Sequence, residues 1–108
     1  MSIDRDERDA LAVACRLTTP ELRARRAAVL TFVRAHLSER RELPNGIGLR
    51  FPADSSVIAR VAELMDAERQ CCPFLELRLT VTPDRGPVWL ELTGPEGTRD
   101  FLTDELGL

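Results

Sequence analysis

The sequence contains no lysine and no tyrosine, and it has no long apolar run. All 15 basic residues are arginine, and 18 acidic residues outnumber them, so the formal net charge is −3. This balance argues against nucleic acid as a partner, because phosphate recognition needs a basic surplus. No stretch approaches the roughly 20 apolar residues of a membrane-spanning helix, so we also expect no membrane partner.

Cysteine is scarce and its number is odd, with three residues in the chain. The first ten residues, MSIDRDERDA, lack the apolar run of a signal peptide, so we expect a cytoplasmic protein with reduced thiols. Hydrophobic residues make up 44% of the 108, which suffices for one core without disulfide bonds. We therefore predict a flexible N-terminus over residues 1–10 and one domain over residues 11–108.

Apolar periodicity predicts an α+β fold. Period-two patterns indicate strands, whereas a stripe that recurs every three to four residues indicates a helix. The predicted order is a strand at 11–17, a helix from 20 to about 38, a hairpin around Asn45-Gly46, a helix from about 55 to Pro73, strands at 74–82 and 88–92, and a last helix containing Phe101 and Leu106. The simplest architecture is a single domain in which a largely antiparallel sheet carries about three helices on one face.

The cysteines admit three interpretations. Cys15 falls on the apolar face of the strand at 11–17, and Cys71 and Cys72 end the second predicted helix. They could be core residues, since cysteine is often buried, although two consecutive helical residues diverge by about 100°. Redox chemistry is a weaker interpretation, because a helix C-terminus favours the neutral thiol and no Cys-X-X-Cys spacing is present. The third is a soft ion, Hg(II), As(III), Cu(I) or Zn(II), held by Cys15, Cys71 and Cys72.

Glu68 is the candidate helper for such an ion. It continues the apolar stripe of the second predicted helix, where a carboxylate is unexpected, and a buried acid needs a partner. It would serve as a fourth ligand or support the ligands, and the competing interpretation is an ion pair with Arg16 or Arg78. These two arginines could also balance the charge of the site. His36 is expected to cap its helix, and the RARR run at 23–26 to be a solvated helix face.

The motif AERQCCPFLELRLTV, followed by GPVWLELTGPEGTRDFL, resembles a group of small bacterial proteins of unknown activity. It is also similar to the C-terminal extension of some actinobacterial regulators of the mercury-resistance type. The matching positions are Glu68, Cys71, Cys72 and Phe74, with Gly94, Pro95 and Gly97 downstream, and Cys15 is the counterpart of an upstream cysteine. The resemblance implies that the thiols and the glutamate act together, and it does not extend to a DNA-binding domain.

Taken together, these patterns predict a thiol-based binding domain for a soft metal or metalloid ion. No catalytic constellation is visible, so we do not expect an enzyme. The alternatives are a protein-interaction module with structural core cysteines, forming a homodimer or binding another protein through the outer sheet face around Trp89, and a redox-responsive thiol protein.

Overall fold

The computed structural model describes residues 19–107, and within them the chain forms three helices and a four-stranded sheet. The elements are α2 (Pro20–His36), β1 (Glu39–Leu43), β2 (Gly46–Phe51), α3 (Ser55–Cys71), β3 (Glu76–Val81), β4 (Val88–Thr93) and α4 (Thr98–Leu106). The strand predicted over 11–17 lies outside the described residues. None of the helices described here combines the length and the apolar character needed to cross a lipid bilayer.

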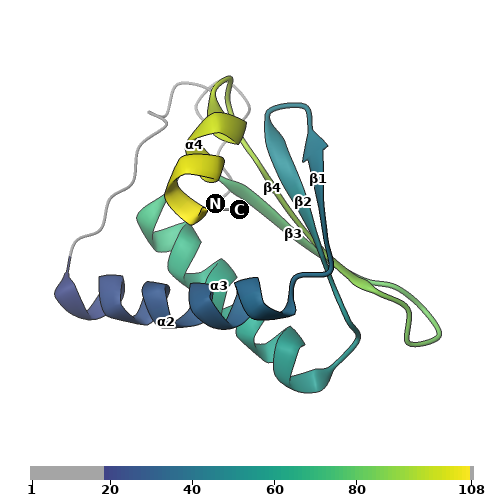
Figure 1. The fold of residues 1–108 in the computed structure, drawn as a ribbon. Helices are drawn as coiled ribbons and strands as arrows, with labels where there is room; N and C mark the ends of the chain where they lie inside the picture. Colours follow the sequence, from purple (N-terminus) through teal and green to yellow (C-terminus); the bar gives the residue numbers. More distant parts are fainter. Residues whose placement is uncertain (1–18, 108) are drawn as a thin grey trace, which may run out of the picture.

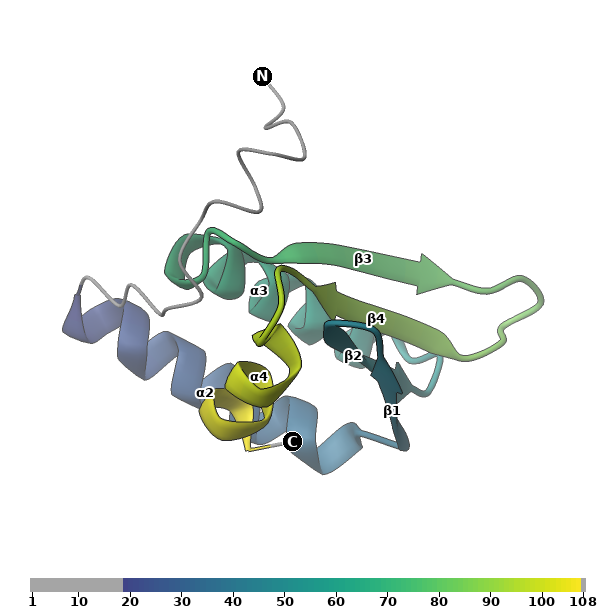
Figure 2. The ribbon, with the colours of Figure 1, turned by 90° about the horizontal axis from the view of Figure 1, so that it is seen from above.

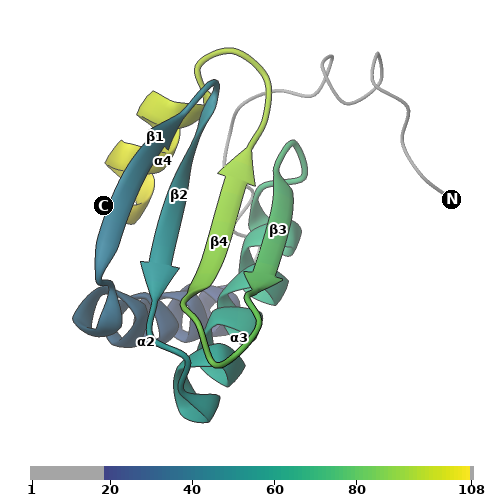
Figure 3. The same cartoon turned by 90° about the vertical axis from the view of Figure 1, so that its right-hand side faces the viewer.

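The sheet has the order β1-β2-β4-β3, and every neighbouring pair is antiparallel. All three helices lie on one face of it, as Figures 1 and 3 show, with α3 behind β3 and α4 behind β1 and β2. Seen from above, α2 crosses α3 in the helical layer and the opposite sheet face carries no helix of residues 19–107 (Figure 2). The predicted α+β architecture is therefore confirmed.

The core forms where the helix-facing side chains of the two central strands meet the helices. Leu49 of β2 lies opposite Leu90 of β4, which in turn lies opposite Leu79 of β3. The alternate residues of these strands, among them Trp89 of β4, point to the opposite, outer face of the sheet. Val81 of β3 lies opposite the buried Val88 of β4, on the face of Leu77 and Leu79, yet it is 59% exposed, because β3 is an edge strand and this residue is its last.

Local sequence signals explain where the elements begin and end. The Thr19 hydroxyl accepts a hydrogen bond from the Leu22 amide and caps α2, with Pro20 as the first helical residue. The hairpin between β1 and β2 turns one residue earlier than predicted, since Gly46 already belongs to β2. Asn45 takes the positive φ of 56°, and a side chain at Gly46 would collide with the Leu92 carbonyl oxygen, which explains the glycine.

Asp54 caps α3 and links the stability of the protein to pH. Its carboxylate accepts hydrogen bonds from the Ser56 side chain and from the Val57 and Ser56 amides, and these lower the pKa of Asp54 below 3.8. Because the folded-state pKa is depressed, the contribution is present above about pH 3.8 and is lost as pH falls through the folded-state pKa. Asp54→Ala should lower the urea midpoint at neutral pH.

The charge of this cap can be tested separately from its hydrogen bonds. In Asp54→Asn the side chain still accepts from the helix amides but no longer titrates near pH 4. The difference in stability between the wild type and this variant should therefore shrink as pH falls from about 6 to about 3. A difference that stays constant over this range would contradict the assignment.

Candidate functional site

The paired cysteines form the turn between α3 and β3. Cys71 is the last residue of α3, and Cys72 follows it with φ −128° and ψ 79°, a non-helical conformation, as expected for a residue before proline, which disfavours the helical region at its predecessor. Both cysteines have no exposed surface. From the sequence, one of the two could have faced solvent, because consecutive helical residues point about 100° apart. That relation does not apply to Cys72, because the helix ends at Cys71.

Aromatic side chains close the turn from the core. Cys71 and Cys72 form a buried cluster with Phe74, and the partly buried side chains of Leu22 and Leu75 pack against it. Phe101 of α4 also packs there and meets Phe74 edge to face, with ring centroids 5.3 Å apart. The cluster thus joins the start of α2, the end of α3, the start of β3 and the middle of α4.

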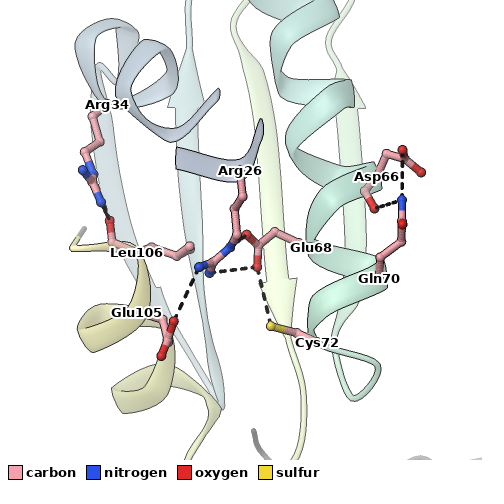
Figure 4. Close-up of polar contacts among 8 residues, drawn as sticks. All are labelled: Arg26, Arg34, Asp66, Glu68, Gln70, Cys72, Glu105 and Leu106. Carbon is pink, nitrogen blue, oxygen red and sulfur yellow. Dashed lines mark hydrogen bonds and ion pairs between the residues drawn. The ribbon is translucent and has the colours of Figure 1, made fainter. Parts of the chain in front are cut away.

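A buried ion pair lies beside this cluster, and Figure 4 shows its members. Arg26 of α2 donates to Glu68 of α3 through Nε to Oε1 at 2.6 Å and through Nη2 to Oε2 at 3.4 Å. Its Nη1 also donates to Oε2 of Glu105 in α4 at 3.5 Å. The side chain of Glu68 has no exposed surface and that of Arg26 has 8%. One guanidinium therefore connects all three helices.

Two sequence-based expectations are wrong here. Arg78 is not the partner of Glu68: it pairs with Glu76 at 3.7 Å on the outer side of the sheet, and its side chain is 71% exposed. Arg26 was expected on a solvated face, yet it occupies the buried stripe of α2 between Leu22 and Val29. The sequence does contain a signal for this pair. The buried stripe of α2 includes one basic residue, Arg26, and the buried stripe of α3 includes one acidic residue, Glu68.

Glu68 also contacts one of the candidate thiols, that of Cys72. The Sγ of Cys72 donates to Oε2 of Glu68 at a separation of 3.6 Å. A tetrahedral ion held about 2.3 Å from a sulfur and about 2.1 Å from an oxygen separates these two atoms by about 3.6 Å as well. The separation therefore suits both a thiol–carboxylate hydrogen bond and a shared metal ion.

Three of the four predicted ligands, Glu68, Cys71 and Cys72, lie within the last turn of α3 and the residue after it, and the contact between Cys72 and Glu68 joins two of them. Cys15 lies outside the described residues. Across residues 19–107, no group of three or more His, Cys, Asp or Glu side chains is arranged to hold a metal ion, so Glu68, Cys71 and Cys72 are not arranged around a common ion.

The single histidine is not part of this site. His36 is the last residue of α2, roughly 15 Å along the helix axis from Arg26. Its ring is exposed and stacks on Phe32 with the centroids 4.2 Å apart, while Nδ1 lies 2.9 Å from the Phe32 carbonyl oxygen. These contacts agree with the predicted role at the helix end.

The outer face of the sheet is a separate feature. Trp89 points outward as predicted, with the Arg41 guanidinium 4.3 Å from its ring centroid. These two residues line a shallow hollow of about 240 Å³ together with Leu43, Gly48, Thr80 and Glu91. Because it lies across the sheet from the cysteines, this hollow is not part of the thiol site.

Comparison of the chain with models of protein families, with curated proteins and with solved structures finds no match, so a function must be argued from the geometry of the cysteines, Glu68 and Arg26.

Proposed function

We propose that this protein binds a soft metal or metalloid ion through Cys71 and Cys72 as thiolates, with Glu68 as an oxygen ligand and Cys15 as the third thiolate. The observation that carries the proposal is the 3.6 Å separation between the Cys72 sulfur and a buried Glu68 oxygen, next to a second buried cysteine. A metal ion would take the place of the thiol proton between these two atoms.

Arg26 makes such a site electrically plausible. A buried charge is costly unless it is compensated, and Arg26 already neutralises Glu68. A divalent ion on two thiolates then leaves the cluster neutral, as does As(III) on three. The C-terminal end of α3, where the helix dipole is negative, disfavours a thiolate without a bound cation, which argues against the redox interpretation. Of the two arginines expected to balance the charge, Arg78 is 71% exposed and pairs with Glu76, and Arg16 lies outside the described residues.

The choice of ions to test follows from the ligands. Thiolates favour Hg(II), Cu(I) and As(III), and a mixed set of sulfur and carboxylate ligands suits Zn(II). The resemblance of residues 67–81 to the extension of mercury-resistance-type regulators is a further reason to include Hg(II). The proposal concerns binding alone and includes no catalytic step.

Native mass spectrometry of the reduced protein with Zn(II), Cu(I), Hg(II) and As(III) tests the proposal. We expect one ion per chain for at least one of the four, and loss of that ion in Cys71→Ser and in Cys72→Ser. Glu68→Gln keeps an oxygen that accepts from Arg26 but removes the charge, so it should weaken Zn(II) binding by about 10–100-fold in a chelator competition.

Glu63→Gln is the matched control, because Glu63 lies on the same helix and pairs with Arg60 at the surface. It should bind metal as the wild type does, and circular dichroism should show that every variant is folded. If none of the four ions is found bound to the protein, or if both serine variants bind the ion as the wild type does, the proposal is contradicted.

The complete burial of both cysteines beside Phe74 favours a second candidate, in which the thiols only fill the core and the protein acts through its outer sheet face. This candidate predicts that a disulfide reagent reacts with Cys71 and Cys72 only after unfolding, and that sizing reveals a dimer or complex sensitive to Trp89→Ala. Fast reaction of both thiols in the folded state would count against it.

A further inference from the structure

A groove runs between α3 and the edge strand β3. Its walls are apolar for the most part, and its volume is about 620 Å³. The lining residues are Ala62, Met65, Asp66 and Arg69 from α3, Leu77 and Leu79 from β3, and Leu75 just before β3. The three leucines are only partly buried, although Leu77 and Leu79 are helix-facing residues of their strand. The core of residues 19–107 is thus incomplete along this side.

The outer edge of β3, beside the groove, pairs with no other strand of residues 19–107. β3 pairs with β4 on one side and is the last strand of the sheet formed by residues 19–107. An edge strand presents a row of backbone donors and acceptors that another strand can use. Val81, at the end of β3, is the one large hydrophobic residue that stands out as exposed in the described part of the chain.

We propose that residues 11–17 of this chain add to β3 as a fifth, antiparallel strand and fill this groove. Residues 11–17 read LAVACRL, so Leu11, Val13, Cys15 and Leu17 share one face of such a strand. Its length, about 23 Å, is close to the roughly 20 Å of β3. An alternating strand with one apolar face is what a half-covered sheet edge requires.

The start of α2 sets the direction of this strand. Leu22, in the first turn of α2, packs against the Cys71–Phe74 cluster, and Leu75, the residue before β3, packs there too. The Arg25 guanidinium lies 3.3 Å from Asp66, which lines the groove. Only two residues separate Leu17 from Pro20, a reach of about 10 Å. Leu17 therefore falls near the start of β3 and Leu11 near Val81.

This register has a consequence for Cys15. Two residues before Leu17, it falls on the helix-facing side near the start of β3, next to the turn that holds Cys71 and Cys72. Its use as a third thiolate rests on the proposed function, whereas the docking of residues 11–17 does not. The test is therefore made on the reduced protein without added metal.

The test compares two aspartate substitutions that differ only in the face they occupy. Val13→Asp places a charge in the groove, and Ala14→Asp places the same charge on the solvent side. In hydrogen–deuterium exchange of the full chain, Val13→Asp should speed the exchange of β3 amides by about tenfold or more, because it removes a buried valine. Ala14→Asp should leave this exchange close to that of the wild type.

A second measurement does not depend on any variant. In the wild type, nuclear Overhauser effects should connect the Val13 methyl groups with those of Leu77 or Leu79. Their absence, together with equal exchange in the two aspartate variants, would overturn the proposal. Protection of β3 that appears only as protein concentration rises would also overturn it, since a second copy of the chain would then occupy the groove. Failure of metal binding would leave these results unchanged.

Discussion

Arg26→Met is expected to lower the free energy of unfolding by about 3–5 kcal/mol, the cost of leaving a buried charge without its partner. The charge concerned is that of Glu68, whose side chain has no exposed surface and accepts two hydrogen bonds from Arg26. The substitution also removes the contact with Glu105, so α2 loses its buried link to both other helices and keeps the links of Arg25 to Asp66 and of Arg34 to the Leu106 carbonyl. Chemical denaturation followed by circular dichroism measures the loss.

The double variant Arg26→Met/Glu68→Met distinguishes a lost ion pair from lost packing. Two apolar side chains of similar length leave no buried charge, so most of the stability should return. Arg25→Met is the matched control: this residue precedes Arg26 and pairs with Asp66 of α3, but its side chain is 49% exposed. It should cost much less, since water and salt screen such a pair. Equal losses in Arg25→Met and Arg26→Met would contradict the assignment.

Phe74→Ala should cost a similar amount, about 3–5 kcal/mol, because it empties a fully enclosed aromatic site. Phe74 contacts Phe101 edge to face and packs against Cys71 and Cys72, so the cavity would open directly beside the thiols. We therefore expect two effects in one variant: a lower free energy of unfolding, and faster reaction of the cysteines with a disulfide reagent in the folded state.

Val81→Ala provides the comparison, since Val81 is 59% exposed and its truncation should change stability by no more than about 0.5 kcal/mol. A loss below about 1 kcal/mol in Phe74→Ala would mean that the aromatic site collapses around the smaller side chain. Unchanged thiol reactivity despite a large loss would show that Phe74 supports the fold without controlling access to the cysteines.

Within residues 19–107, the helices, the hairpin and the order of the elements along the chain could be predicted because their signals are local. Thr19-Pro20 and Asp54 begin helices, Pro73 ends one, and alternation over 75–81 and 88–92 indicates strands. The exposure of Val81 could not be predicted in this way. Whether a residue on the apolar face of a strand is covered depends on how far the neighbouring helix extends.

The polar part of the site was harder to predict, because its partners are distant in sequence. Glu68 was recognised as a buried acid, but its partner lies 42 residues earlier, on a face that looked solvated. In the sequence, the arginine run at 23–26 looks like any solvated charged surface of a helix. Only the position of the opposing helix shows that one of its members, Arg26, is buried. A search for opposite charges at the stripe positions of two helices would have found Arg26 and Glu68.

The placement of Trp89 separates two optical signals. It is the only tryptophan and the chain has no tyrosine, so near-ultraviolet fluorescence arises from a single indole ring beneath the Arg41 guanidinium. That ring lies on the far side of the sheet from the cysteines, so its emission follows strand pairing, while sulfur-to-metal charge-transfer absorption follows ligation. Assembly of the fold and capture of an ion can thus be recorded simultaneously in one cuvette.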